Sequence, residues 1–308
     1  PSSQPTSQPS LQPISQPSSQ PTSQPTSMPS NPTSEPTLTF SPTSMPVLRK
    51  CDTDAYYSSI PELYDGAPDL NDRNSWLNLV DKLLNLLVIT HEQVLYEKVW
   101  DAVVDVDVDP QDSDLVKCIY TNISLPNQET FRDKDSFLGW SLQHLFSAGY
   151  ITNTSSYEYS DVHMITASQY NVNLDRGDRP FDKCYESIDN TCEQPAYSTT
   201  RVKTTSDSGS NIDDDSLPRW MPPAFVRGFI ARSNFYAALR YNGSDTEAYT
   251  EQLTLSPCGC KSVFAMGNLT TLLSWADEEP VRSWEVARNN ATCYDWQSNR
   301  NPFTDFPW

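Results

Sequence analysis

The pattern of hydrophobic and polar positions changes sharply near residue 47. Before it, proline alternates with serine, threonine and glutamine, and apolar side chains are too few to form a core. After it, apolar residues recur at regular spacings, and this part of the chain holds all eight tryptophans and every cysteine. We therefore predict a repeat segment over residues 1–46 and a folded domain over residues 47–308.

Several stretches of the domain place apolar residues at the three- and four-residue spacing of a helix. Predicted helices cover residues 74–107, 222–243, 268–279 and 280–297. In the first of these, the apolar positions that set the spacing are Trp76, Leu77, Val80, Leu83, Leu84 and Leu87. The short, β-branched stretch 115–125 predicts a strand. The domain is therefore expected to be of the α+β class, with helices dominating.

Two polar stretches interrupt this pattern. The first is an acidic run formed by Asp105, Asp107, Asp109, Asp112 and Asp114. Such a run can bind calcium, but this one lacks the glycine and the terminal glutamate of an EF-hand loop, so we favour a solvated loop. The second stretch, residues 200–217, is polar and predicts an exposed insertion loop.

Proline occupies every fourth position from Pro1 to Pro29. Each proline fixes its own φ at about −65° and drives the preceding residue toward extended backbone, which predicts a polyproline II rod. The serine and threonine hydroxyls then face outward on all sides, which is typical of an O-glycosylated stalk. A flexible linker is the alternative. Sugars, or side-by-side packing against another copy of the chain, are the two ways we expect a rod to be ordered.

Charge and hydropathy exclude some classes of protein. The formal net charge is −19 at pH 7, which is unfavourable for gripping a nucleic-acid backbone, and we interpret it as a means of solubility. No apolar run approaches the length of about 18 residues that a membrane span needs, so we expect no membrane partner. The chain begins with proline rather than methionine, and we expect that a leader preceded it.

Sequons and cysteines favour an extracellular protein. The N-x-S/T sequons, which predict N-linked glycans, are at Asn122, Asn153, Asn242, Asn268 and Asn290. The disulfide candidates are Cys51, Cys118, Cys184, Cys192, Cys258, Cys260 and Cys293. Their number is odd, so one thiol is free or joins another chain. The cysteines lack zinc-like CxxC spacing and the chain has three histidines, so a structural zinc site is not expected.

Three phrases of the domain carry a resemblance to a known family. They are WSLQHLF (140–146), DVHMITASQYNVNLDRGDRPF (161–181) and QSNRNPFTD (297–305). Together with YYSSI (56–60), VWDAVVDVDVDP (99–110) and RGFIARSNFYAALRY (227–241), they resemble the secreted bacterial endonuclease I family and follow the same order. The resemblance covers about residues 56–307, and NRNPF is its most specific part. It implies a His-Me finger, or ββα-metal, fold with additional helices.

Members of this family cut DNA and RNA without sequence preference and use one divalent metal ion. The resemblance implies that His144 is the general base, which takes a proton from water so that hydroxide attacks phosphorus. It implies that Asn173 is an amide ligand to Mg²⁺ or Ca²⁺, which stabilises charge on the phosphate. Arg176 and Arg232 match arginines that lie near the phosphate or brace the site.

The sequence also departs from the family pattern. Gln143 stands where the family has a metal-binding glutamate, and an amide oxygen brings no charge to hold the metal. At four more positions where the family has a charged or polar residue, this chain has Leu142, Met164, Thr166 and Phe229. Asp161 and Asp175 are carboxylates that can substitute.

Each candidate residue also has a structural interpretation. His144 lies between apolar residues and can equally be a core histidine bonded to a backbone carbonyl. His163 has lost the neighbour with which the family pairs it, and is expected to be structural. Asn173 and Arg176 can be explained by turn formation alone.

Two functions of different classes follow. The favoured hypothesis is an extracellular structural or display protein, in which a glycosylated stalk carries an endonuclease I-like head with a weakened or lost catalytic site. Copies of the chain would then assemble through the stalk or the head, for example into a fibre. The alternative is an active secreted nuclease that needs a metal and acts on DNA or RNA. Whether the protein is an enzyme stays open.

Overall fold

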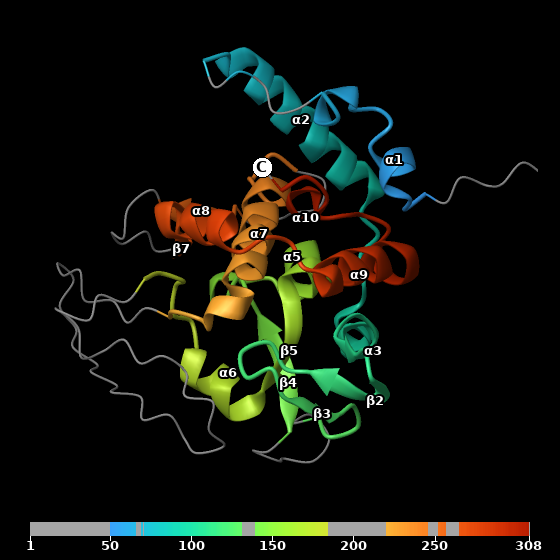
Figure 1. Ribbon diagram of the computed structural model, residues 1–308, viewed down its shortest axis with the longest axis vertical. Helices are drawn as coiled ribbons and strands as arrows, with labels where there is room; N and C mark the ends of the chain where they lie inside the picture. The colour runs from blue at the N-terminus through green and yellow to red at the C-terminus, as the bar shows by residue number, and fades with distance from the viewer. Residues whose placement is uncertain are drawn as a thin grey trace, which may run out of the picture. The chain divides into compact units, whose positions relative to one another are not determined.

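The computed structural model describes residues 50–65, 69, 71–130, 139–183, 220–245, 252–256 and 265–307. The chain divides into two units, Pro1–Val47 and Leu48–Trp308, and all described residues belong to the second. The predicted stalk, the predicted loop 200–217, and Cys184, Cys192, Cys258 and Cys260 lie outside the described residues. Helices and small sheets are mixed in the described part, which confirms the α+β class (Figure 1).

Helices are the main regular structure among the described residues of this unit. The α-helices are α1 (Thr53–Tyr56), α2 (Arg73–Thr90), α3 (Tyr96–Val106), α5 (Tyr157–Ser160), α6 (Tyr170–Arg176), α7 (Ala224–Arg240), α8 (Leu269–Glu278), α9 (Ser283–Ala291) and α10 (Pro302–Asp305). The 3-10 helices are η1 (Pro61–Leu63), η2 (Ala148–Tyr150) and η3 (Val162–Met164), and η4 (Thr292–Gln297) is a π-helix. None of the described helices combines the length and hydropathy needed to cross a bilayer.

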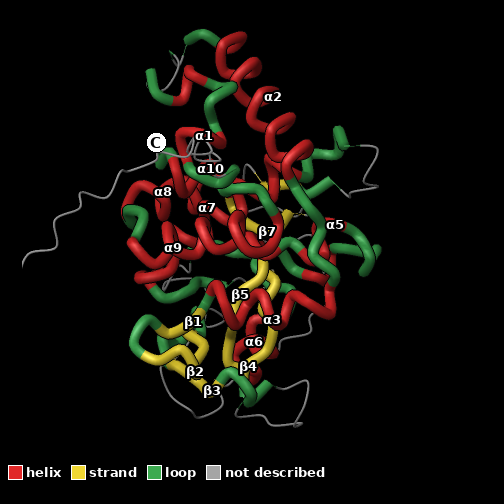
Figure 2. The backbone as a smooth tube through the Cα atoms, turned by 90° about the vertical axis from the view of Figure 1, so that its right-hand side faces the viewer, coloured by secondary structure: helices red, strands yellow, loops and turns green. Residues whose placement is uncertain are grey.

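The strands form three small sheets. The first is antiparallel and contains β1 (Val108–Asp109), β2 (Asp112–Lys117) and β3 (Ser124–Pro126). In the second, β4 (Trp140–His144) pairs antiparallel with β5 (Ile165–Gln169), so that His144 lies opposite Ile165. In the third, β6 (Thr254–Ser256) pairs parallel with β7 (Ala265–Asn268). Helix α6 follows β5 without a break and lies beside this strand pair, so β4, β5 and α6 form a ββα unit (Figure 2).

The single helix predicted over 74–107 is wrong in its middle. Residues 91–95, between α2 and α3, are not helical. His91 has extended backbone, and its side chain is buried with Nδ1 3.9 Å from Asp161 Oδ2 and its ring edge-to-face with Tyr157. These distant contacts override the local helical pattern.

The apolar positions that set the helical spacing of α2 are not all buried. Leu77 and Val80 are exposed, and Trp76 is only partly buried. The buried positions of this helix are Leu79, Leu83, Leu84, Leu86 and Leu87. The apolar residues of α2 surround much of its circumference, and therefore spacing alone did not fix which side faces the core.

The stretch around the acidic run folds as a hairpin. Its predicted strand, 115–125, is two strands, β2 and β3, joined by a turn in which Asn122 has φ of 55°. Asp112 and Asp114 are exposed, as a solvated loop requires. Asp107 is not, because its carboxylate is buried, forms a 2.8 Å ion pair with Arg288 and accepts bonds from the Thr166 hydroxyl and the Ala167 N–H. The prediction of a loop is therefore wrong, since most of the run lies in α3, β1 and β2, and the prediction of solvent exposure is wrong at Asp107.

Helix α7 occupies the centre of the helical part and confirms the buried helix predicted over 222–243 (Figure 1). It contacts α8, α10 and α2. Its close approach to the end of α8 depends on Gly228, because a Cβ added there would lie within 3.0 Å of the Glu279 carbonyl oxygen. The helices predicted over 268–279 and 280–297 are also confirmed, as α8 and as α9 followed by η4.

A disulfide and hydrogen bonds link the first and last segments of the described domain. A disulfide joins Cys51 to Cys293. Arg300 donates from Nη1 to the Cys51 carbonyl at 2.7 Å and also binds Asp305, which accepts a hydrogen bond from Tyr57. Among the described cysteines, Cys118 is the one free thiol, and it is buried. Through Arg300, the phrase NRNPF thus links the last segment of the domain to the first.

Candidate functional site

A hollow of about 280 Å³ lies at the end of the ββα unit, where β4 meets α6 and η2. The residues that line it are Leu142, Gln143, His144, Ser147, Ala148, Tyr170, Asn173, Leu174, Arg176, Gly177 and Asp178. The structure therefore brings together four of the residues predicted from the sequence, namely Gln143, His144, Asn173 and Arg176. It does not bring Arg232 to them.

His144 is the last residue of β4 and is 7% exposed. Its Nε2 lies 3.0 Å from the Tyr159 carbonyl oxygen. A carbonyl can only accept a hydrogen bond, so the imidazole proton resides on Nε2 and Nδ1 carries the lone pair. Burial lowers the pKa of His144 to about 4, so the ring is neutral at neutral pH. A neutral imidazole with its lone pair on Nδ1 can accept a proton from water.

The surroundings of His144 fix the orientation of its ring. Tyr96 stacks on the imidazole with 6.1 Å between ring centroids, and Tyr159 lies against it at 5.1 Å. His144 makes the bond to a backbone carbonyl that is expected of a core histidine. Because the residue also lines the hollow, this bond does not exclude a chemical role and sets the tautomer that such a role needs.

Gln143 is 1% exposed, and its amide is only half satisfied. Its Nε2 donates to the His144 carbonyl at 2.8 Å, whereas its Oε1 is buried and accepts no hydrogen bond among the described residues. A buried oxygen without a partner is unfavourable by about 1–3 kcal/mol unless a ligand or water occupies it. The amide oxygen is therefore the half of this side chain that lacks a partner among the described residues.

Asn173 lies on α6 and is half-buried. Its Nδ2 donates to Ser141 Oγ and to the Leu142 carbonyl, both at 2.8 Å. These two bonds use both amide hydrogens and fix the orientation of the group, so Oδ1 points away from these two acceptors on β4. Asn173 and Gln143 thus share one property: the NH₂ of each donates to the protein, and the oxygen of neither accepts a hydrogen bond from the described residues.

Arg176, at the end of α6, is a brace. Its guanidinium is buried and donates to the carbonyls of His144 and Leu145, at 2.8 and 2.9 Å, and lies over the Phe181 ring. Of the two roles implied by the family, phosphate contact or support of the site, these contacts provide support. They hold the end of β4, and with it His144, against α6.

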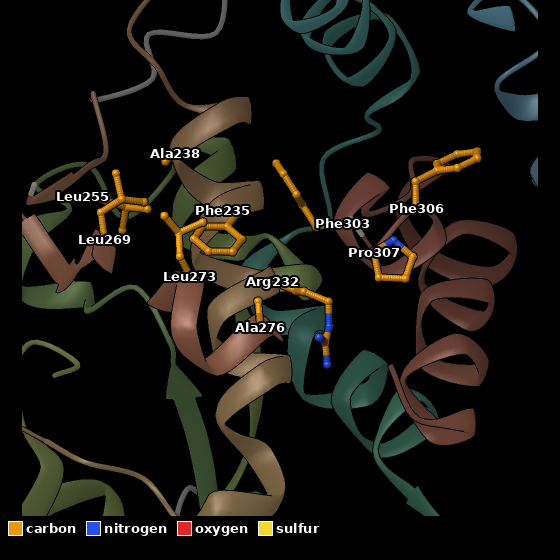
Figure 3. A pocket seen from close by; sticks show the side chains of 10 residues that line it. All are labelled: Arg232, Phe235, Ala238, Leu255, Leu269, Leu273, Ala276, Phe303, Phe306 and Pro307. Carbon is orange, nitrogen blue, oxygen red and sulfur yellow. The ribbon is translucent and has the colours of Figure 1, made fainter. Parts of the chain in front are cut away.

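Arg232 lies elsewhere, on α7. It forms a buried bidentate ion pair with Glu285, at 2.9 and 2.8 Å, and donates to the Glu279 carbonyl. It borders a different pocket of about 320 Å³, whose other walls are apolar and include Phe235 and Phe303 (Figure 3). Its contacts join α7 to α9 and to the end of α8.

Two other predicted residues are part of the core. His163 is buried, with Nε2 3.1 Å from the Asn299 carbonyl. Asp161 is fully buried and accepts hydrogen bonds from Tyr236, Tyr241 and Gln297, and from the backbone N–H of His163. Neither residue lines the hollow, and nor does Asp175, so none of them replaces the missing glutamate there.

Sequence reasoning missed Asp178. It is the one carboxylate among the residues that line the hollow. It follows Gly177, whose φ of 51° ends α6, and it accepts a hydrogen bond from Ser147 Oγ. The sequence did contain a signal, since Asp178 lies two residues after Arg176 within the phrase DRGDRPF.

The hollow offers oxygen atoms to a cation. No group of three or more histidine, cysteine, aspartate or glutamate side chains that could hold a metal ion occurs in the described part of the chain. Amide and carboxylate oxygens are nevertheless ligands for Mg²⁺ and Ca²⁺. The orphaned Oε1 of Gln143 and the oriented Oδ1 of Asn173 fit such an ion, although both groups are neutral.

The sequons occupy different environments. Asn122 and Asn153 are exposed, whereas Asn242, Asn268 and Asn290 are half-buried. Asn268 accepts hydrogen bonds from the N–H groups of Thr270 and Thr271 and so caps α8. Asn122 and Asn153 are therefore the most accessible of the five positions, and glycosylation stays a prediction for all of them.

Comparisons with known proteins agree on one family. The sequence profile named Endonuclease I matches residues 77–308. The extracellular ribonuclease of Bacillus amyloliquefaciens is 30% identical over 225 residues, which cover 73% of this chain and 70% of the relative. The extracellular ribonuclease of Bacillus subtilis (strain 168) is 29% identical over 267 residues, which cover 85% of this chain and 79% of the relative.

Proposed function

The chain belongs to the endonuclease I family, and on this basis we propose that it is an extracellular nuclease that hydrolyses the phosphodiester bonds of RNA. The hollow formed by β4, α6 and η2 is the reaction site. The observation that carries this proposal is the state of His144, which is neutral, oriented by the Tyr159 carbonyl and part of the lining of the hollow. The names of the two relatives support both RNA as substrate and an extracellular location.

The chemistry that these residues support is general-base hydrolysis. Nδ1 of His144 takes a proton from water as the water oxygen forms a bond to phosphorus and the bond to the leaving oxygen breaks. Arg176 positions the base, since it holds the carbonyls of His144 and Leu145. Gln143 Oε1 and Asn173 Oδ1 would hold a bound Mg²⁺ or Ca²⁺, which would supply positive charge to stabilise the phosphate.

A second function is supported by Gln143. A site that holds its cation through neutral amides binds it weakly, which favours a structural or display role for the head without turnover. In this case the segment 1–46 is a glycosylated stalk, and copies of the chain assemble through it or through the head. The two functions make opposite predictions for purified protein.

The test is cleavage of RNA and of single- and double-stranded DNA by the purified protein, with Mg²⁺, with Ca²⁺ and with a chelator. We expect RNA cleavage with a divalent cation, none with the chelator, and a loss of 100-fold or more in His144→Ala, within the range of about 10²–10⁴ for a general base. The variant must keep the circular dichroism spectrum of the wild type. Purification of both proteins in parallel controls for contaminating ribonuclease.

Absence of cleavage by the wild-type protein under every condition overturns the proposal. Cleavage of equal rate in His144→Ala also overturns it. Gln143→Glu separates the two functions, because it restores the glutamate of the family. If only Gln143→Glu cuts RNA, the wild-type head has lost turnover and the structural role is supported.

A further inference from the structure

We propose that Asp178 supplies the negative charge of a divalent-cation site in the hollow, in place of the glutamate that Gln143 has replaced. This inference rests on the proposed function, because the cation would serve the same reaction site. It concerns a residue outside the set that the family pattern predicts. The site would contain the Asp178 carboxylate, Gln143 Oε1 and Asn173 Oδ1.

The first argument is the kind of atom that the hollow presents. Gln143 Nε2 and both hydrogens of Asn173 Nδ2 are used in bonds to the protein. Arg176, although cationic, donates to the carbonyls of His144 and Leu145. The Nε of Arg176 is buried and has no hydrogen-bond partner among the described residues, but the two amides leave only oxygen available, which suits a cation and not an anion.

The second argument is the orphaned oxygen of Gln143. This side chain is 1% exposed, and Oε1 accepts no hydrogen bond among the described residues. An oxygen in that position is unfavourable unless something binds it. A hard cation coordinated by the amide oxygen removes this cost, and it does so in the hollow that Asp178 also lines.

The third argument is the way in which Asp178 is held. Gly177 donates its N–H to the Asn173 carbonyl at 3.0 Å and ends α6, which places Asp178 beside η2. Ser147 Oγ donates to Asp178 Oδ1, while Oδ2 accepts no bond from the described residues. Ser147 therefore orients the carboxylate and leaves one oxygen for a ligand.

The fourth argument is the space that Gly149 provides. A Cβ added to Gly149 would lie 2.7 Å from both carboxylate oxygens of Asp178, so a side chain at this position would displace the carboxylate. Glycine at 149 is thus matched to aspartate at 178. The remaining contact of this turn, from the Tyr150 hydroxyl to the Asp178 carbonyl at 3.4 Å, holds the backbone.

The charge requirement explains why a carboxylate is needed. Sites for Mg²⁺ and Ca²⁺ combine neutral oxygens with one or more carboxylates. Gln143 contributes none, and Asp161 is occupied in the core. Among the residues that line the hollow, Asp178 is the only source of negative charge.

The experiment measures cation binding directly, by isothermal titration calorimetry with CaCl₂ and MgCl₂ and by the rise in the thermal unfolding midpoint with added cation. The variants are Asp178→Asn, which keeps the shape and removes the charge, and Asp175→Asn as a matched control on the same segment. Asp178→Asn combined with Gln143→Glu tests rescue. Unfolding without cation confirms that each variant folds.

We expect the wild-type protein and Asp175→Asn to bind cation with equal affinity, Asp178→Asn to bind at least tenfold more weakly, and the double variant to recover. Equal affinity in the wild type and Asp178→Asn overturns the inference, as does absence of binding to the wild type. Failure of the proposed function is distinguishable. If Asp178→Asn loses cation affinity but the wild type cuts no RNA, the cation site stands and the nuclease does not.

Discussion

A fall in pH from 8 to 5 should destabilise the domain strongly, because all three histidines of the chain are buried and neutral. His91, His144 and His163 are 7%, 7% and 4% exposed. Burial lowers the pKa of each to about 4, and for His91 and His163 this effect outweighs the attraction of Asp161. In the unfolded chain the same groups titrate at about 6.5.

The sign and size of the effect follow from this difference in pKa. Between pH 6.5 and pH 4 the unfolded chain binds protons that the folded domain does not, so stability is fully present above pH 6.5 and falls as the pH approaches 4. At pH 5 each histidine lowers the free energy of unfolding by about 2 kcal/mol relative to pH 8, or about 6 kcal/mol for all three. A typical domain has about 5–15 kcal/mol in total.

Two measurements check this prediction. Urea unfolding at pH 8 and pH 5 gives the change in the free energy of unfolding, and His91→Asn should lose about 2 kcal/mol less than the wild type over this interval. NMR follows the imidazole Cε1–H signals, of which the chain has only three. We expect none of them to titrate between pH 8 and pH 5. The comparison ends at pH 5 because burial raises the pKa of Glu285. Protonation of this carboxyl group at lower pH stabilises the folded state and so opposes the effect of the histidines.

A Cε1–H signal that titrates with a midpoint near 6.5 would refute the reasoning for that histidine. Equal stability at pH 8 and pH 5 would refute it for all three. For His144 the result also bears on catalysis, since a base whose pKa is about 4 stays unprotonated at pH 5.

Two further predictions concern the packing of the helices. Arg288→Ala should lower the free energy of unfolding, measured in urea, by about 3–5 kcal/mol, because it leaves the buried Asp107 carboxylate without its cation. The control Lys98→Ala should lower it by less than about 1 kcal/mol, because the Lys98–Asp101 pair is exposed. Similar losses in the two variants would contradict this. Gly228→Ala should cost about 1–3 kcal/mol in the same assay, because the added methyl group meets the Glu279 carbonyl where α7 approaches α8, and an unchanged unfolding midpoint would show that the two helices separate easily.

The sequence predicted the elements whose signals are local. Helix α7 followed from the spacing of its apolar residues, and α8 and α9 from the same kind of pattern. The break between α2 and α3 did not, because it depends on the contact of His91 with Asp161, seventy residues away. The burial of Asp107 depends on Arg288, which is more distant still.

The candidate site shows the same division. His144, Gln143 and Asn173 could be found because they belong to short phrases, and the ββα unit brings them to one hollow. Asp178 also belongs to such a phrase but was not singled out, because its place in the hollow depends on the turn at Gly177 and on contacts with Ser147 and Gly149. Arg232 shares a phrase with the family, but its partner Glu285 comes from another helix and holds it away from the hollow.

The disulfide between Cys51 and Cys293 has a mechanical consequence. The two cysteines are separated by 242 positions in the sequence, so the covalent loop that they close contains most of the domain. A pulling force applied to the residues before Cys51 and after Cys293 passes from one sulfur atom to the other and does not travel along the backbone between them. The hollow and its side chains lie inside this loop and are therefore shielded from tension, however hard the flanking segments are stretched.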